Sequence, residues 1–239
     1  MEKRVITLLL LFGLLCDLQL CLAETTEPTK TFDRQVIAVL EDQPDLIEAA
    51  VFLYMKHPST TDIAIWDAGK FYRYNPETHL PTSQVIENEY EGNHRIQVVG
   101  HGQVQGSGGQ VTVTMSGLTA QELVERVSKL IKKPADGVTE INKISLAGCE
   151  LAPAGQENTP SYDAKVQYLK DTIRYLTEGK IDTVVTARSL LVAVSPSGQK
   201  LLGELQNDEI VWKSKERKSH YRWRASKRNK THYLGAICD

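Results

Sequence analysis

Residues 95–102 read RIQVVGHG, an apolar run that ends in a histidine between two glycines. The length and composition of the run predict a buried strand, so His101 follows the carboxyl end of that strand. A second stretch, SLAGCE at 145–150, has the same layout with Cys149 in the place of the histidine. Ligands of open α/β sheets bind beyond the carboxyl ends of the strands. We therefore expect His101 and Cys149 to converge at one edge of a sheet.

Cysteine and histidine at two such strand ends are the components of a nucleophilic pair. A cysteine attacks as its thiolate, and a nearby imidazole raises the thiolate fraction and protonates the leaving amine. The neighbouring glycines let a substrate backbone approach and leave amide N–H groups to hold an oxyanion. The plainer interpretation is that Cys149 is a small buried residue and that His101 is a satisfied structural histidine.

Strand and helix patterns alternate on both sides of these stretches. Thr119 followed by Glu122 is a capping box that opens a helix. Four glycines between 102 and 109 predict a mobile or tightly turning loop. The alternation predicts a parallel or mixed sheet with helices on both faces. The strands are expected at 34–40, 62–66, 70–74, 95–100, 141–147 and 182–187, the helices at 42–56, 119–132 and 163–176, an extended segment at 190–194 and hairpins near 200–202 and 210–213.

The N-terminus has the layout of a secretory signal peptide: a basic start at Met1–Arg4, an apolar run at 5–15 and a small residue at Ala23. This predicts cleavage near Ala23, a polar flexible leader over 24–32, and a secreted or lumenal product. A short membrane anchor is the alternative, but an apolar run of about 12 residues is short for a span that needs roughly 20. We expect no stable membrane span.

Composition excludes several classes of protein. The chain of 239 residues has a net charge of -2, with 41% hydrophobic and 24% charged residues, which is typical of a globular domain and not of collagen, a coiled coil or a disordered chain. The charge balance argues against a nucleic-acid partner. Beyond the signal peptide only Cys149 and Cys238 remain. They either form one disulfide, or Cys149 is a working thiol.

The stretches VVGHG at 98–102 and SLAGC at 145–149 resemble the autoprocessing cysteine protease domain of large bacterial toxins. Those toxins are the glucosylating clostridial toxins and the multifunctional autoprocessing RTX toxins. The resemblance covers about residues 33–215 and implies a caspase-like α/β fold, a mixed sheet flanked by helices with a C-terminal β-hairpin flap. Residues 216–239 are then a basic extension. Further stretches that match in the same order lie at 33–37, 48–50, 56–58, 118–123, 184–190 and 197–200.

The resemblance implies a cysteine endopeptidase. Cys149 is its nucleophile, His101 orients or protonates, and the amides around Gly102 and Cys149 hold the oxyanion. Members of the family cut after leucine in their own chain once inositol hexakisphosphate binds a basic pocket beside the flap. The implied partners are therefore a peptide or protein substrate and an inositol polyphosphate or another polyanion. No metal and no further cofactor are implied.

Basic residues match the polyanion pocket of the family, since a polyanion needs converging lysines and arginines on a rigid frame. Between 213 and 230 there are nine basic residues and one acid. The alternatives for this tail are a solvated surface or a surface for nucleic acid or acidic glycans. Asn229 opens a glycosylation sequon inside it. The candidate polyphosphate ligands are Lys56, Arg95, Arg188, Lys200, Lys213 and Lys215.

The chain departs from the family pattern in three places. Gln43 stands where the clostridial members have a catalytic aspartate, and Asp42 beside it is the candidate replacement. Gln199 replaces the first residue of a basic pair. The leader at 24–32 has no leucine at which to cut. A third catalytic member mainly orients the imidazole, so its loss weakens a Cys–His pair. The alternative function is a catalytically weak or silent polyanion-binding module of the same fold.

Overall fold

The computed structural model describes residues 32–107, 110–133, 137–149, 151–153, 159–188, 191–206, 209–213, 219–222 and 237–238. The predicted signal peptide, Lys215 and Asn229 lie outside the described residues. Phe32–Asp239 forms one compact unit. None of the helices in these ranges is long and apolar enough to cross a membrane.

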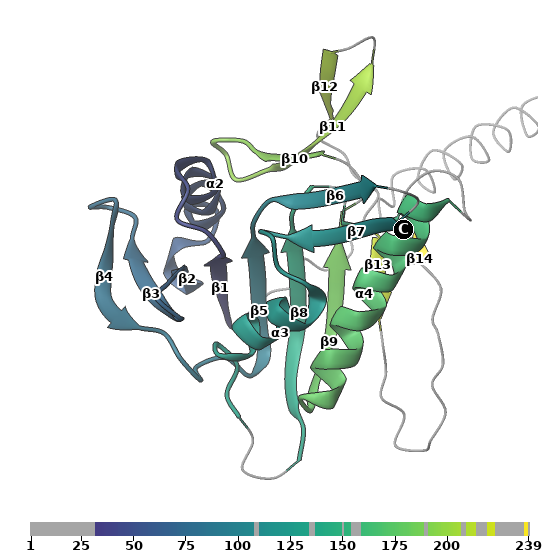
Figure 1. Ribbon diagram of the computed structural model, residues 1–239. Helices are drawn as coiled ribbons and strands as arrows, with labels where there is room; N and C mark the ends of the chain where they lie inside the picture. The colour runs from purple at the N-terminus through teal and green to yellow at the C-terminus, as the bar shows by residue number, and fades with distance from the viewer. Residues whose placement is uncertain are drawn as a thin grey trace, which may run out of the picture. The chain divides into compact units, whose positions relative to one another are not determined.

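A mixed sheet is the centre of the fold, with nine strands among the described residues in the order β14-β13-β9-β8-β5-β1-β2-β3-β4 (Figure 1). Strands β9, β8, β5, β1 and β2 run parallel, whereas β3, β4, β13 and β14 pair antiparallel. The bounds are β1 Arg34–Val39, β2 Thr61–Asp67, β3 Lys70–Asn75, β4 Leu80–Val85, β5 Gly92–Val99, β8 Thr139–Ala147, β9 Ile181–Ala187, β13 Ser219–Arg222 and β14 Ile237–Cys238. This arrangement confirms the α/β caspase-like fold.

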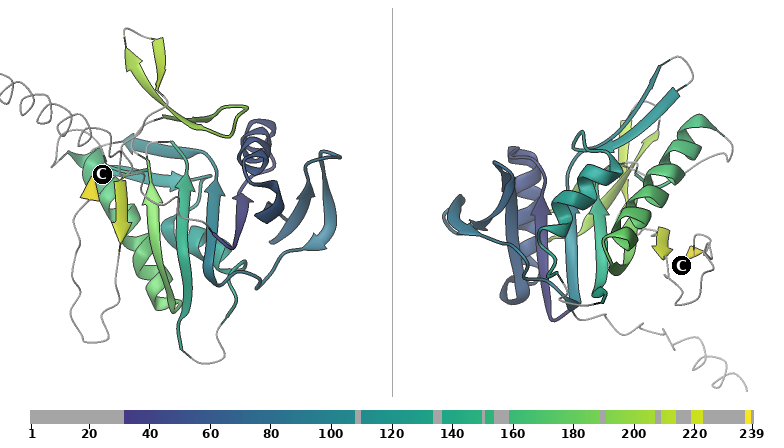
Figure 2. Two further views of the ribbon diagram at one scale, coloured as in Figure 1. Left: turned by 180° about the vertical axis from the view of Figure 1, so that it is seen from behind. Right: turned by 60° about the horizontal axis from the view of Figure 1, so that its bottom comes forward.

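Helices cover both faces of the sheet (Figure 2). Side chains alternate along a strand, so Val36 and Ala38 of β1 enter one core while Ile37 and Val39 enter the other. The first core packs under α3 and α4, and the second packs under α2. The helix bounds are α2 Pro44–Met55, α3 Ala120–Ser128 and α4 Pro160–Glu178, with a 3₁₀ turn η1 at Pro58–Thr60.

The predicted capping box opens α3. The hydroxyl of Thr119 accepts from the amide of Glu122, and the carboxylate of Glu122 accepts from the amide of Thr119 at 2.9 Å. Four apolar residues of the helix then face the core, namely Ala120, Leu123, Val124 and Val127. The helix ends at Ser128, earlier than expected, because Ile131 is extended and forms an isolated parallel bridge with Tyr90.

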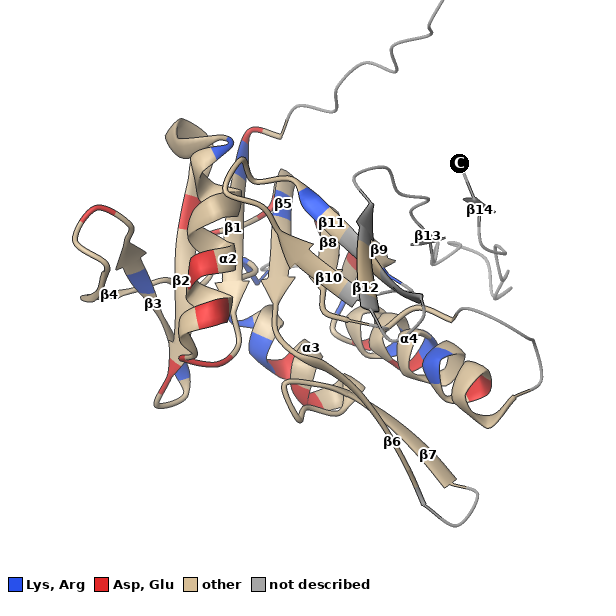
Figure 3. Cartoon of the chain, turned by 90° about the horizontal axis from the view of Figure 1, so that it is seen from above, with Lys and Arg blue, Asp and Glu red and all other residues tan. Residues whose placement is uncertain are grey.

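The glycine-rich stretch after His101 is a hairpin, so the loop predicted over 102–109 is wrong for its first six residues. Strands β6, Gly102–Ser107, and β7, Gln110–Met115, pair antiparallel and extend away from the sheet (Figure 3). Val104 faces Val113 across this pair, and both pack against the first core. In β7, Val111, Val113 and Met115 alternate with polar residues, which is the pattern of a strand with one packed face.

The C-terminal flap is a small sheet of β10 Leu191–Val194, β11 Lys200–Gln206 and β12 Glu209–Lys213. Its first turn rests on the end of α2. Gly198 there has a φ of +73°, and a Cβ at this position would lie 2.5 Å from the carbonyl oxygen of Phe52. Only glycine fits both the conformation and the space.

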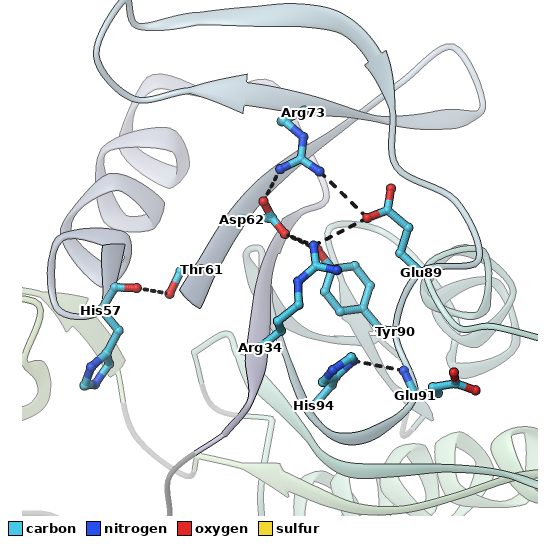
Figure 4. A network of polar contacts seen from close by, with 9 residues as sticks. All are labelled: Arg34, His57, Thr61, Asp62, Arg73, Glu89, Tyr90, Glu91 and His94. Carbon is cyan, nitrogen blue, oxygen red and sulfur yellow. Dashed lines mark hydrogen bonds and ion pairs between the residues drawn. The ribbon is translucent and has the colours of Figure 1, made fainter. Parts of the chain in front are cut away.

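A cluster of ions ties the amino ends of β1 and β2 to β3 (Figure 4). The carboxylate of Asp62 accepts hydrogen bonds from Arg73, from Arg34 at 2.7 Å and from the Tyr90 hydroxyl at 2.7 Å. Glu89 lies 3.5 Å from Arg34 and 3.7 Å from Arg73. The Asp62 side chain is 14% exposed, so this carboxylate is largely shielded from water, whereas Arg34 at the rim of the cluster is 42% exposed.

Candidate active site

Neighbouring parallel strands bring His101 and Cys149 to one edge of the sheet. Strands β5 and β8 pair in a register that sets Val99 opposite Ala147. His101 and Cys149 each follow two residues later, so their loops leave the sheet side by side (Figure 1). The convergence expected from the two sequence stretches therefore has a simple geometric origin.

Glycines let the two loops touch. A Cβ on Gly102 would lie 1.8 Å from the carbonyl oxygen of Cys149, so its Cα rests against that peptide. A Cβ on Gly148 would lie 3.0 Å from the oxygen of Gly100 and 3.3 Å from the nitrogen of Gly102. The amide of Gly102 thus lies against the peptide that carries the thiol, where a donor to an oxyanion is needed.

The imidazole of His101 contacts the segment that leads into α2. Its Nε2 is 3.1 Å from Oε1 of Gln43 and 3.4 Å from Oδ2 of Asp45. The amide nitrogen of Gln43 donates to Glu41 at 2.8 Å, which turns the amide oxygen towards the ring. Sequence reasoning missed Asp45, although it lies only two residues from Gln43.

Asp42, the predicted third member, lies beside Tyr74. Burial raises the pKa of that tyrosine, and the charge of Asp42 raises it further. The structure thus brings Gln43 and Asp45 to the imidazole and sets Asp42 next to a tyrosine of β3.

The Cys149 thiol is half-buried against the flap. Its Sγ accepts from the amide of Val192 at 3.4 Å and lies 3.9 Å from the carbonyl oxygen of the same residue. Strand β10 therefore covers the sulfur with its backbone. Cys149 is a free cysteine in this structure and does not form the disulfide with Cys238 that was the alternative.

Three of the six predicted polyphosphate ligands line one shallow surface pocket, namely Arg95, Arg188 and Lys200. Lys143 joins them and was missed by sequence reasoning, although it sits opposite Arg95 in the β5–β8 register. Figure 3 shows Lys and Arg positions in blue on strands near β11. The hydroxyls of Ser145 and Thr186, 2.9 Å apart, complete the polar lining.

The cavity gathers four basic side chains, Arg95, Lys143, Arg188 and Lys200. Burial lowers the pKa of Arg95 to about 10, and burial together with the charge of Arg95 lowers the pKa of Arg188 to about 10. The Nε of Arg95 is buried and has no hydrogen-bond partner among the described residues. No acidic residue is among the described residues that line the cavity. Such a site is suited to an anion.

The other predicted ligands lie elsewhere or outside the described residues. Lys56 follows α2, and its Cβ would be 3.2 Å from a Cβ at Gly198, so it lies against the flap turn. Lys213 ends β12 opposite Leu202. Lys215 is outside the described residues.

A row of polar side chains joins the cavity to the end of α2. Lys200 donates to Gln97 at 2.9 Å, Gln97 donates to Gln35 at 3.1 Å, and Gln35 donates to Thr61 at 2.6 Å. The Thr61 hydroxyl then donates to the carbonyl of His57 at 2.6 Å. Buried glutamines on β5 and β1 thus connect the flap to the helix across one face of the sheet.

Fold and site together define a cysteine protease domain of the toxin autoprocessing kind, and the chain belongs to the Peptidase C80 family, which it matches over residues 30–202. It is also similar to the multifunctional-autoprocessing repeats-in-toxin of Vibrio cholerae serotype O1 (strain ATCC 39315 / El Tor Inaba N16961), with 27% identity over 207 residues. That match spans 84% of this chain and 4% of the toxin.

Proposed function

We propose that this protein is a cysteine endopeptidase that uses a Cys149–His101 pair, cleaves after leucine and is activated by an inositol polyphosphate. The observation that carries the proposal is the contact between the two loops at the carboxyl ends of β5 and β8. Membership of the Peptidase C80 family supports the reaction class.

The reaction follows from the groups at this edge. The imidazole of His101 takes the thiol proton of Cys149, and Sγ then forms a bond to the substrate carbonyl carbon. The oxyanion is held by amides such as that of Gly102. The C–N bond breaks as the imidazolium gives its proton to the leaving amine. A water molecule then hydrolyses the thioester and frees the thiol.

The cavity of Arg95, Arg188 and Lys200 supports activation by a polyanion. Its cations are half-buried beside one another, and a phosphate group could accept hydrogen bonds from several of them at once. Lys200 begins β11, and its neighbour β10 covers the thiol. A ligand that binds this cavity better in the competent state than in the resting state shifts the population of the active enzyme.

The test is covalent labelling of residues 24–239 with a leucyl chloromethyl ketone, with and without inositol hexakisphosphate, followed by mass spectrometry. We expect labelling at Cys149 that depends on the ligand and is lost in His101→Ala. Labelling of Cys149 that does not require inositol hexakisphosphate would support the protease but reject its activation by this ligand. Labelling that His101→Ala leaves unchanged would reject the pair.

A catalytically silent polyanion-binding module is the second candidate, favoured by Gln43 at the position of the family aspartate. Calorimetry would then show binding of inositol hexakisphosphate that Arg95→Gln weakens, while the folded, reduced protein stays unlabelled at Cys149. Labelling of Cys149 would exclude this candidate.

We also propose that the protein is secreted or lumenal, with cleavage of a signal peptide near Ala23. The basic start and apolar run at the N-terminus support this. N-terminal sequencing of the protein recovered from the medium of expressing cells would test it. A product that starts at Met1 and stays with the cells would contradict it.

A further inference from the structure

We infer that Asp45 is the carboxylate that positions His101. This rests on the proposed Cys149–His101 pair and assigns it a third member. Asp45 differs from both positions considered from the sequence. Asp42 is the expected replacement, and Gln43 stands at the position of the family's aspartate.

Hydrogen bonding around the ring fixes its tautomer. Two acceptor oxygens face Nε2 of His101, Oε1 of Gln43 at 3.1 Å and Oδ2 of Asp45 at 3.4 Å. The donation from Gln43 to Glu41 keeps the amide oxygen, and not the amide nitrogen, turned to the ring. A ring nitrogen that faces two acceptors carries the proton. Nδ1 is then the basic nitrogen left to take the thiol proton.

The carboxylate, and not the amide, stabilises the charged ring. When the imidazole accepts the thiol proton it becomes a cation, and a full negative charge stabilises a cation more than an amide dipole does. The charged groups that contact it are Asp45 directly and Glu41 through Gln43, and Cys149 lies in the neighbouring loop that follows β8.

The helix holds this carboxylate in place. Asp45 lies in the first turn of α2, which begins at Pro44, so its backbone is fixed by the helix. The side chain of Asp45 is 62% exposed and that of His101 is 38% exposed. Water therefore screens the pair, and we expect a smaller effect than that of the buried carboxylate of a serine protease triad.

The test is the rate at which iodoacetamide alkylates Cys149, measured as a function of pH with and without inositol hexakisphosphate. Asp45→Asn should slow alkylation about tenfold at neutral pH and move the midpoint of the pH–rate profile to higher pH. Asp45→Glu should restore most of the rate. Asp163→Asn is the matched control, because Asp163 is an acid in the first turn of α4, which also begins with a proline. It should leave the profile unchanged.

The variants separate the possible failures. If Asp45→Asn alkylates at the wild-type rate while His101→Ala alkylates slowly, Asp45 has no positioning role and the Cys149–His101 pair stands. If His101→Ala also alkylates at the wild-type rate, His101 does not activate Cys149, and both the proposed pair and this inference are rejected. Equal slowing at every pH in Asp45→Asn, with a lower unfolding temperature and no rescue by Asp45→Glu, would show a purely structural role and also overturn the inference.

Discussion

At the scale of single residues, Gly102 sets how closely the two loops approach. Because a Cβ there would lie 1.8 Å from the Cys149 carbonyl, Gly102→Ala must push the loops apart. We expect the free energy of unfolding to fall by about 2 kcal/mol and labelling of Cys149 to be lost. Urea unfolding and mass spectrometry measure both effects. Gly106→Ala is the control, since the nearest atom to its Cβ is a Val111 methyl at 3.4 Å. Equal losses in the two variants would contradict the argument.

His94 makes stability depend on pH. Its Nδ1 accepts from the amide of Glu91 at 3.0 Å, and burial followed by the charge of Arg34 lowers its pKa from 6.5. Below pH 6.5 the unfolded chain therefore binds a proton that the folded chain does not, so the free energy of unfolding falls as the pH falls through this window. His94→Gln should flatten this part of the pH profile in urea unfolding. An unchanged slope would show that other groups cause it.

At the scale of elements, the turn between β10 and β11 attaches the flap to α2. Gly198→Ala would drive a Cβ to 2.5 Å from the Phe52 carbonyl in a left-handed conformation, so the turn must lift off the helix. Because this flap carries Lys200 and covers the thiol, we expect weaker binding of inositol hexakisphosphate by calorimetry and faster proteolysis of the flap. Gly117→Ala is the control, since it has a φ of +72° with nothing near its Cβ. Unchanged binding in Gly198→Ala would refute this link.

Elements with a strong pattern could be predicted from the sequence, and those specified by their neighbours could not. The apolar run of β5 and the capping box of α3 appear in the structure where their residues indicated them. Strand β4 was missed because LPTSQV is a polar edge strand that only its pairing with β3 defines. The β6–β7 hairpin was missed because its glycines outweighed the alternating valines.

The residues of the candidate site also fall into those that could be predicted from the sequence and those that could not. His101 and Cys149 could be found because each follows a recognisable strand. Lys143 and Asp45 could not, because one depends on the register between two strands and the other on where the first turn of a helix points. Gln35 and Gln97 are polar residues buried on β1 and β5, where Gln97 donates a hydrogen bond to Gln35; no pattern in the sequence indicates this pairing.

At the scale of the whole molecule, stability and chemistry sit at opposite ends of the sheet. The Asp62 cluster lies at the amino ends of β1 and β2, and the candidate site lies at the carboxyl ends of β5 and β8. Asp62→Asn leaves Arg34 and Arg73 without their shared carboxylate, so it should cost about 3 kcal/mol in urea unfolding. Alkylation of Cys149 should be unchanged while the variant is folded.

An exposed ion pair supplies the comparison for this prediction. Asp171 pairs with Arg174 on the surface of α4 at 2.9 Å. Asp171→Asn should cost about 0.5 kcal/mol, because water screens such pairs. Similar costs for the two variants would show that the Asp62 cluster adds no stability beyond an ordinary surface pair.

The register between β5 and β8 also determines when, during synthesis and folding, the candidate site can assemble. Cys149 leaves the ribosome 48 positions after His101, and the two meet only when β8 has paired with β5. A slip of one residue would set Gly148 or Glu150 opposite the imidazole and turn the core side chains of β8 outwards. On the proposed mechanism, a nascent or misfolded chain has no assembled Cys149–His101 pair, so we expect it to cleave no protein in its surroundings until folding is complete.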